Sequence, residues 1–167
     1  MTTFTTIAAI DWTSWTADDL ATLCFVFEGD QVLLIRKKRG LGAGKVNAPG
    51  GRVDPGETPL ACAIREVQEE LHVTPEQLRH CGEHRFQFVD GYSLHVHVYA
   101  AVAHTGTATE TEEAIPLWTA VNAIPYAEMW ADDVLWIPHM LAERRFDGRW
   151  IFDGDDIVDH VLDLLDD

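Results

Sequence analysis

The alternation of apolar and polar residues predicts several β-strands in the chain. The candidate strands are residues 20–27, 31–35, 84–89 and 93–103. The turn sequence EGD separates the first two, and the dipeptide Asp90–Gly91 joins the last two. The acidic segment ATETEEAIPLW, which carries Glu110, Glu112 and Glu113, is predicted to be a loop that leads into a further strand.

Three polar rings share one face of the last of these strands. His95, His97 and Tyr99 alternate with Val96 and Val98, and side chains two apart on a strand point the same way. Two histidines in this arrangement can bind a metal ion, but a solvated sheet face accounts for them more simply. We therefore interpret them as a polar face.

Between residues 58 and 72 the apolar period changes from that of a strand to that of a helix. Apolar side chains recur three and four residues apart, at Leu60, Ile64, Val67 and Leu71. This spacing predicts a helix with that stripe against the core. Thr58 and Pro59 are typical of a helix start, and a long glycine-rich loop, residues 36–57, precedes them.

The last third of the chain is less regular. A helix is predicted to begin at Asp132 or Asp133, either of which could cap it, and to run toward Arg145, with Pro138 kinking it or marking its first turn. The sequence ERRFDGRWIF predicts a hairpin around its Asp-Gly dipeptide, residues 147–148. Apolar residues between 157 and 165 recur at a helical period.

The first predicted helix carries a cluster of carboxylates. Glu66, Glu69 and Glu70 are three and four residues apart, so they form one acidic patch roughly opposite the apolar stripe. Their mutual repulsion would be relieved by a hard divalent cation, and Mg²⁺ suits a site that also holds phosphates. An acidic, solvated helix face is the simpler alternative for such a patch alone.

The residues around this patch follow a longer pattern, G-x5-E-x7-R-E-U-x-E-E-x-G-U, in which U is apolar. The matching positions are Gly51, Glu57, Arg65, Glu66, Val67, Glu69, Glu70 and Val73. This segment resembles the Nudix box of the Nudix hydrolases. Its one departure is His72 in place of glycine at the helix exit, where a left-handed backbone is expected. We expect this departure to cost about 1 kcal/mol of stability without loss of chemistry.

Composition and charge exclude several classes of protein. The 167 residues suit one domain with a full core, and the three cysteines, odd in number and without CxxC spacing, indicate a reducing compartment. No apolar run approaches a membrane span or a signal peptide, so a cytoplasmic location is expected. The net charge of −16 disfavours nucleic-acid binding. We expect a monomer whose partner is a small molecule.

Beyond the box, from about residue 21 to residue 165, the chain is similar to the MutT-like oxidised purine nucleoside triphosphate hydrolases. The markers are KKRGLGAGKVN, MWADDVLWIP and RRFDGRWIFDGDD. The resemblance implies an α+β Nudix fold, a mixed β-sheet sandwich flanked by helices in an α/β/α arrangement, with a strand rather than a helix near residues 157–165. It also implies a Nudix domain over residues 21–167 and an N-terminal extension, residues 1–20, without a counterpart.

The same resemblance assigns residues to two functions. Metal binding and catalysis fall to Glu66, Glu69, Glu70 and Glu113, with Glu112 as the near alternative to Glu113, and Arg65 orients the glutamates. Base recognition and the pocket wall fall to Thr22, Lys37, Asn47, Phe86, Phe88, Trp130, Asp132 and Asp133. Singly, several of these have ordinary core or strand explanations, but as an ordered set they indicate a pocket.

Some pocket positions depart from the animal members of the family. Leu41 replaces a phenylalanine, Val46 replaces a tryptophan, and Ala48 with Pro49 replaces a glycine and phenylalanine pair. A less aromatic rim is expected to grip a flat base more loosely, which affects the ranking of bases rather than the reaction.

The activity implied is hydrolysis of oxidised purine nucleoside triphosphates, 8-oxo-dGTP and 2-hydroxy-dATP, to the monophosphate and pyrophosphate, with Mg²⁺ as cofactor and Mn²⁺ as a substitute. Two alternatives stay open from the sequence. One is a Nudix pyrophosphatase for another diphosphate, such as ADP-ribose or a dinucleoside polyphosphate. The other is a silent binding module, which the intact carboxylates disfavour.

Overall fold

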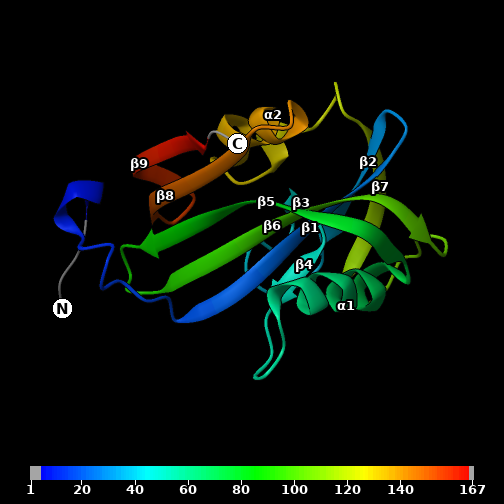
Figure 1. Cartoon of the computed structure of the whole chain (residues 1–167), viewed down its shortest axis with the longest axis horizontal. Coiled ribbons are helices and arrows are strands. Elements are labelled where there is room, and N and C mark those ends of the chain that lie inside the picture. The colour runs from blue at the N-terminus through cyan, green and yellow to red at the C-terminus, as the bar shows by residue number, and fades with distance from the viewer. Residues whose placement is uncertain (1–4, 166–167) are drawn as a thin grey trace.

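A single mixed β-sheet runs through the computed structural model, which describes residues 5–165 (Figure 1). The strands are β1 (Asp19–Glu28), β2 (Gln31–Lys37), β3 (Val46–Asn47), β4 (Gly50–Arg52), β5 (Thr74–Phe88), β6 (Ser93–Thr105), β7 (Ala114–Ala120), β8 (Arg145–Asp153) and β9 (Asp156–Leu165). Their order is β3-β2-β1-β6-β5-β8-β9, with β4 paired to β1 and β7 paired to β2. The pairs β1/β6 and β5/β8 are parallel, and the others are antiparallel.

Helices lie on both faces of this sheet. Figure 1 shows α1 (Pro59–Leu71) below the sheet and α2 (Asp133–Leu141) above it. Val26 on β1 packs with α1, and its neighbour Phe25 points to the opposite face, where Trp136 of α2 lies. A strand covered on both faces is apolar almost throughout, as β1 is. The three-layer α/β/α arrangement predicted from the sequence is confirmed.

Local interactions fix both ends of α1. The Ala61 N–H donates to Thr58 Oγ1 at 3.1 Å, and Pro59 occupies the first turn, as the sequence predicted. At the other end His72 has φ +61° and ψ +31°, the left-handed conformation expected there. Its N–H donates to the Gln68 carbonyl oxygen, and its side chain is exposed. The histidine therefore ends the helix in the same way that a glycine would.

The apolar stripe predicted for α1 is partly wrong. Leu60 is 44% exposed and Ile64 is half-buried, whereas Cys62 and Ala63 are fully buried together with Val67 and Leu71. Small side chains at residues 62 and 63 let the helix lie close to β1 and β4, and this rotates the buried face away from Leu60.

Three predictions for the last third of the chain are corrected. Helix α2 ends at Leu141 rather than near Arg145, and it retains Pro138 in its interior. The Asp147–Gly148 dipeptide lies inside the continuous strand β8, not in a hairpin, because both residues pair with β5 on one side and β9 on the other. The glycine is explained by packing, since a side chain at residue 148 would collide with His84 and Trp150. The turn falls instead at residues 154–155.

Residues 156–165 form β9, a strand, and not a helix. This strand pairs antiparallel with β8 along its whole length. His160 stacks on Trp150 with the ring planes 8° apart, and Leu162 packs against the same core. Cross-strand pairing with β8 thus overrides the helical period of the apolar residues, as the family resemblance implied.

Strand β5 is longer than predicted and contains a β-bulge. It begins at Thr74, ten residues before the predicted start at His84. His80 pairs with Tyr99 and Gly82 pairs with Val98, so Cys81 is the extra residue. A bulge inverts the alternation of side chains that follow it. Cys81 packs into the core on the α2 side, where Phe146 leaves no room for a side chain at residue 82.

Residues 5–18 form an extension that is docked on the sheet. They include a 3₁₀ turn, η1 (Ile7–Ala9), whose Ile7 packs with Ile151 and Val161 of the last two strands. Trp15 Nε1 donates to Gln87 Oε1 at 2.9 Å. A second 3₁₀ turn, η2 (Tyr126–Glu128), precedes α2. None of the helices within residues 5–165 has both the length and the apolar character needed to cross a bilayer.

Candidate active site

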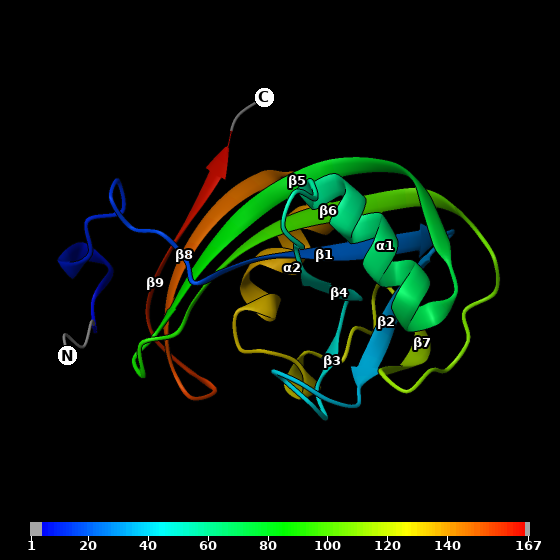
Figure 2. The same ribbon diagram turned by 90° about the horizontal axis from the view of Figure 1, so that it is seen from below.

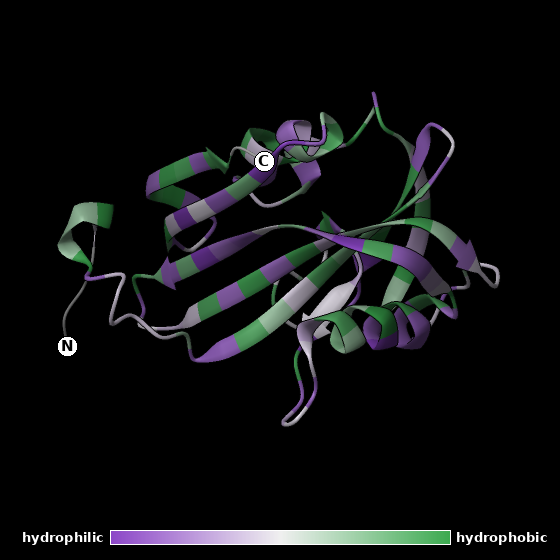
Figure 3. Cartoon of the chain, in the orientation of Figure 1, coloured by the Kyte–Doolittle hydropathy of each residue, from purple (hydrophilic) through white to green (hydrophobic). Residues whose placement is uncertain are grey.

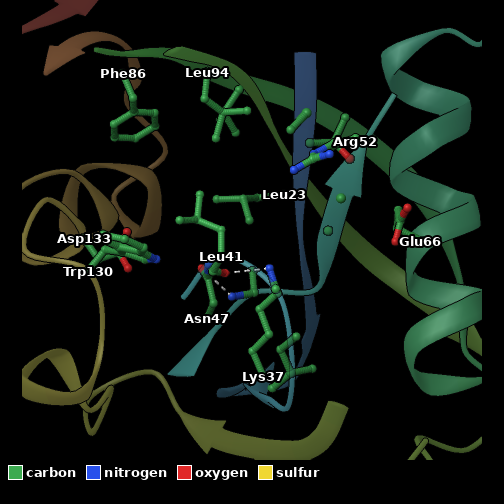
Figure 4. Close-up of a pocket in the computed structure, with 18 of the residues that line it drawn as sticks. Leu23, Lys37, Leu41, Asn47, Arg52, Glu66, Phe86, Leu94, Trp130 and Asp133 are labelled. Atoms are coloured by element: carbon green, nitrogen blue, oxygen red, sulfur yellow. Dashed lines mark hydrogen bonds between the residues drawn. The ribbon is translucent and has the colours of Figure 1, made fainter. Parts of the chain in front are cut away.

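A cavity of about 590 Å³ lies between β1, the 37–54 loop, α1 and α2 (Figure 4). Of the residues that the sequence predicted for the site, these line the cavity: Thr22, Lys37, Asn47, Glu66, Glu70, Phe86, Phe88, Glu113, Trp130, Asp132 and Asp133. Arg65 and Glu69 do not. Figure 4 shows Glu66 on α1 at one side and Trp130 and Asp133 at the other, with Asn47 and Lys37 between them.

Three carboxylates meet at the α1 end of the cavity. Glu66, Glu70 and Glu113 each offer an oxygen within 4.8 Å of the others. The first two are one helical turn apart on α1, and the third immediately precedes β7. Glu112, the near alternative, is exposed and does not line the cavity. We call Glu66, Glu70 and Glu113 the carboxylate cluster.

Glu70 is the most buried member of the carboxylate cluster. It is 3% exposed, and the Gly50 N–H donates to its Oε1 at 2.9 Å. Burial raises the pKa of Glu70 to about 8 and also raises the pKa of Glu66, against the opposing effect of Arg65. Carboxylates held this close at neutral pH fit a divalent cation with oxygen ligands, which would remove the repulsion.

Arg65 holds the carboxylate cluster from outside the cavity. It binds Glu57 through two hydrogen bonds, from Nε at 2.7 Å and Nη2 at 2.9 Å. These bonds lower the pKa of Glu57 to about 2. Nη1 donates to Glu66 Oε1 at 2.9 Å and to Glu69 Oε2 at 3.1 Å. Arg65 is thus placed to orient glutamates, and Glu69, half-exposed, lies at the edge of the site.

Two adjacent glycines let β4 fit between β1 and α1. A side chain at Gly50 would collide with the Thr22 carbonyl oxygen, and one at Gly51 would lie about 2.5 Å from Glu66 Oε1. The first glycine of the box is therefore required by close packing beside a carboxylate, not by an unusual backbone angle. Thr22 itself is buried, with Oγ1 3.4 Å from Cys62 Sγ on α1.

The opposite end of the cavity holds two adjacent aspartates, each 3% exposed. Trp136 Nε1 donates to Asp132 Oδ2 at 2.8 Å, whereas Asp133 Oδ2 has no hydrogen-bond partner within residues 5–165. Asp132 occupies the cap position of α2, but its side chain makes no capping bond, so the predicted capping role is wrong. Burial raises the pKa of Asp132 to about 6 and that of Asp133 further above its usual value.

Aromatic rings form the wall beside these aspartates. Trp130 lies edge-on to Phe88 at 6.3 Å and to Phe152 at 5.8 Å between ring centroids. Lys45 Nζ lies 5.1 Å from the centre of the Trp130 ring. Asn47 Oδ1 accepts the Ala48 N–H at 2.9 Å, which fixes the orientation of the side chain and leaves its amide NH₂ for another partner.

Several residues that line the cavity were not predicted. They include Arg39, Arg52, Asp54, Tyr92, Leu94 and Phe152. Arg39 Nη2 lies 3.0 Å from Glu113 Oε1, and a cluster of basic residues next to a glycine-rich loop in so acidic a chain could have indicated it. Phe152 had no such signal, because the sequence predicted it only as the last residue of the hairpin ERRFDGRWIF. Lys37, which was predicted, donates to the Leu41 carbonyl oxygen at 2.8 Å.

Comparisons with known proteins agree with this architecture. The NUDIX domain family model matches residues 18–140. An oxidized purine nucleoside triphosphate hydrolase from Danio rerio is 43% identical over 150 residues, covering 89% of this chain and 96% of that protein. The Mus musculus protein of the same name is 40% identical over 149 residues, covering 88% and 96%.

A solved structure gives the same result for the fold. A MutT protein from Bacillus halodurans superposes with a TM-score of 0.79 at 26% identity, covering 87% of this chain and 97% of that one. The family model, the two relatives and this superposition all involve most of the chain, including α1 and its glutamates. The chain belongs to the Nudix family of hydrolases.

Proposed function

We propose that this protein hydrolyses oxidised purine nucleoside triphosphates, 8-oxo-dGTP and 2-hydroxy-dATP among them, to the monophosphate and pyrophosphate. The relatives at 43% and 40% identity carry the name of this activity. The observation that carries the proposal is that one cavity joins the carboxylate cluster to Trp130 and the buried aspartates. A nucleotide whose base and phosphates must be held at the same time needs both ends.

At the phosphate end, Glu66, Glu70 and Glu113 would hold Mg²⁺, with Mn²⁺ as a substitute. Bound there, the ion would lower the pKa of a water molecule and neutralise charge on phosphoryl oxygens. Arg65 keeps the helix glutamates oriented through its hydrogen bonds. Glu69 is proposed as a further ligand, which requires it to leave Arg65. Lys37, Arg39 and Arg52 line the same cavity and can offset phosphate charge.

At the base end, Trp130 would stack on the base while Asn47, Asp132 and Asp133 read its edge. A guanine-type edge presents an oxygen acceptor beside N–H donors, which requires one protonated and one ionised carboxyl group. Trp136 donates to Asp132, so the ionised form is favoured there and the proton is favoured on Asp133. Moving the proton to Asp132 would suit an oxidised adenine.

The cysteines and the net charge bear on where the protein acts and on what it binds. The three cysteines are free and buried, which agrees with action in a reducing compartment such as the cytoplasm. The net charge of −16 opposes binding to nucleic acid, and we expect the protein to act as a monomer on a small-molecule substrate.

A substrate panel tests the proposal. Initial rates with Mg²⁺ would be measured for 8-oxo-dGTP, 2-hydroxy-dATP, dGTP, dATP, ADP-ribose and diadenosine polyphosphates. We expect the highest kcat/KM for an oxidised purine triphosphate, with nucleoside monophosphate and pyrophosphate as products. A clear preference for ADP-ribose or a dinucleoside polyphosphate would overturn it.

A further inference from the structure

A second group of metal-binding side chains lies on the sheet face beside α1, outside the cavity. His80 and Glu83 come from β5, and His97 comes from β6. Each offers a nitrogen or oxygen atom, and these atoms all lie within 4.8 Å of one another. We propose that His80, Glu83 and His97 bind a Zn²⁺-class transition-metal ion.

The bulge in β5 is what makes this group possible. Residues 80 and 83 are three apart, so in a regular strand they would point to opposite faces of the sheet. Because Cys81 is an extra residue, His80 pairs with Tyr99 while Glu83 pairs directly with His97. Tyr99 and His97 share a face of β6, and so His80, Glu83 and His97 point to the same side.

The distances within the group suit a small ion. His80 Nε2 lies 2.9 Å from His97 Nδ1, and one ligand atom from each of the two histidines and Glu83 lies within 4.8 Å of the other two. Tetrahedral coordination with metal–nitrogen bonds of about 2.0 Å separates two ligand nitrogens by ~3.3 Å. The two imidazole nitrogens need to move apart by only a few tenths of an ångström. Their present hydrogen bond already requires that one of them be an unprotonated acceptor, the form that binds metal.

The surroundings favour binding as well. His95 Nε2 lies 2.7 Å from Glu83 Oε1 and holds that carboxylate in place. Arg85 lies closer to Asp147, with Nη1 3.1 Å from Oδ1, than to Glu83, where Nη2 is 3.9 Å from Oε1, so a cation at this group would share Glu83 with a weak ion pair. The side chains of Glu83 and His97 are 30% and 19% exposed, so an ion can reach them and keep a water ligand.

Helix α1 packs on the neighbouring part of this sheet face, beside Tyr99, and His80, Glu83 and His97 themselves are only partly buried. Figure 2 shows α1 over one end of the sheet and the N-terminal segment beyond the other, with β5 and β6 running between them. Figure 3 shows polar and apolar residues alternating along these two strands, so one face of each is polar. Within this polar face, two imidazoles and a carboxylate converge, with one ligand atom of each within 4.8 Å of the others.

The ligand types distinguish this group from the carboxylate cluster. Imidazole nitrogens favour Zn²⁺, Co²⁺ or Ni²⁺, whereas Mg²⁺ prefers oxygen ligands and retains water. Three protein ligands leave one position for water. A Zn²⁺-class ion would therefore bind here without competing with Mg²⁺ in the cavity.

Calorimetric titration with ZnCl₂ and with MgCl₂ tests the proposal on the whole chain. His97→Ala and Glu83→Gln should each weaken Zn²⁺ binding by ~10-fold or more. Removing a residue that only supports a metal ligand already lowers affinity by about 10-fold, so removing a ligand should cost at least as much. His104→Ala, on the same strand outside the group, is the matched control and should bind as the wild type does. Glu70→Gln should keep this Zn²⁺ site, because it changes only the carboxylate cluster.

A second measurement covers the case in which a variant folds poorly. Co²⁺ bound to His80 and His97 with four ligands should give an intense visible absorption band in the wild type and in Glu70→Gln, whereas oxygen-ligated, six-coordinate Co²⁺ absorbs weakly. The conservative variant His80→Gln should lose the band. If Glu70→Gln loses the Zn²⁺ site, or if His97→Ala and Glu83→Gln both retain it, the ion binds elsewhere and the proposal is overturned.

Discussion

The two ends of the active-site cavity both contain buried carboxyl groups, but their environments offer different ways to relieve the repulsion. At the α1 end, three carboxylates converge, and guanidinium groups pair with two of them, Arg65 with Glu66 and Arg39 with Glu113. At the α2 end, two adjacent aspartates receive one N–H, from Trp136, and face aromatic rings. The first arrangement is suited to a divalent cation and the second to a proton. Burial raises the pKa of carboxyl groups at both ends, but it favours cation binding at the α1 end and proton binding at the α2 end.

The largest expected effect comes from removing one charge at the cation end. Glu70→Gln keeps the shape of the side chain and an oxygen to accept the Gly50 N–H, but it binds metal less well. We expect kcat to fall by ~10²-fold or more with the fold intact. Initial rates at saturating Mg²⁺, with circular dichroism as the folding control, would check this. Glu76→Gln, at an exposed glutamate outside the cavity, is the control variant and should keep the wild-type kcat. A drop of less than threefold in Glu70→Gln would show that the carboxylate cluster does not act in the reaction.

In the metal-free protein, the pH dependence of the free energy of unfolding distinguishes the two ends of the cavity. Burial raises the pKa of Glu70 from 4.5 to about 8, so in this range the folded protein binds more protons than the unfolded chain. Its free energy of unfolding should therefore fall as pH rises from 5 to 8, by about 3 to 4 kcal/mol from this group. Denaturant titrations with EDTA at several pH values would measure the slope.

The same titrations with Mg²⁺ show which end is responsible. The ion should remove the contribution of Glu70, and Glu70→Gln should remove it without the ion. The slope from the aspartate pair should remain in both cases, because burial raises the pKa of Asp132 to about 6 and that of Asp133 further. If Mg²⁺ does not alter the slope of the free energy of unfolding against pH, the additional protons of the folded protein are bound by groups other than Glu70.

Base selection tests the proton end. Asp132→Asn and Asp133→Asn each fix one arrangement of donors and acceptors. Each should change the ratio of kcat/KM between 8-oxo-dGTP and 2-hydroxy-dATP by ~10-fold or more, since a mismatched polar contact costs about 1 to 3 kcal/mol. The ratio would be measured from pH 6 to pH 9, because the wild-type ratio should itself follow the titration of the pair. Two variants that keep the wild-type ratio throughout would show that these aspartates do not read the base.

The smallest effect concerns the helix that carries the cation end. His72 ends α1 at φ +61°, a conformation that glycine adopts without strain. His72→Gly should raise the free energy of unfolding by about 1 kcal/mol and leave kcat unchanged. Thermal unfolding and initial rates would check both. If kcat changed as well, the exit of α1 would contribute to the chemistry and not only to stability.

The sequence predicted the cation end more completely than the proton end. Residues of α1 are close in the chain, so their spacing alone brought Glu66 and Glu70 together. The proton end depends on strands β5 and β8 meeting α2, and there the hairpin and helix predicted after residue 143 were wrong. A short apolar period near residue 160 fits a helix and an edge strand equally well, and only pairing with β8 decides between them. Glu83 reaches the face that carries His80 and His97 through a one-residue bulge that no period reveals.

The bulge at Cys81 also determines how this protein tolerates insertions and deletions. After that residue, Phe86 and Phe88 face the cavity, while Glu83 and Arg85 face the solvent. Deleting one residue there would restore regular pairing and turn every later side chain of β5 to the opposite face. Charged residues would then occupy the aromatic wall. The length of β5 is therefore under tighter constraint than the identity of most of its residues, and relatives should vary there by substitution rather than by gaps.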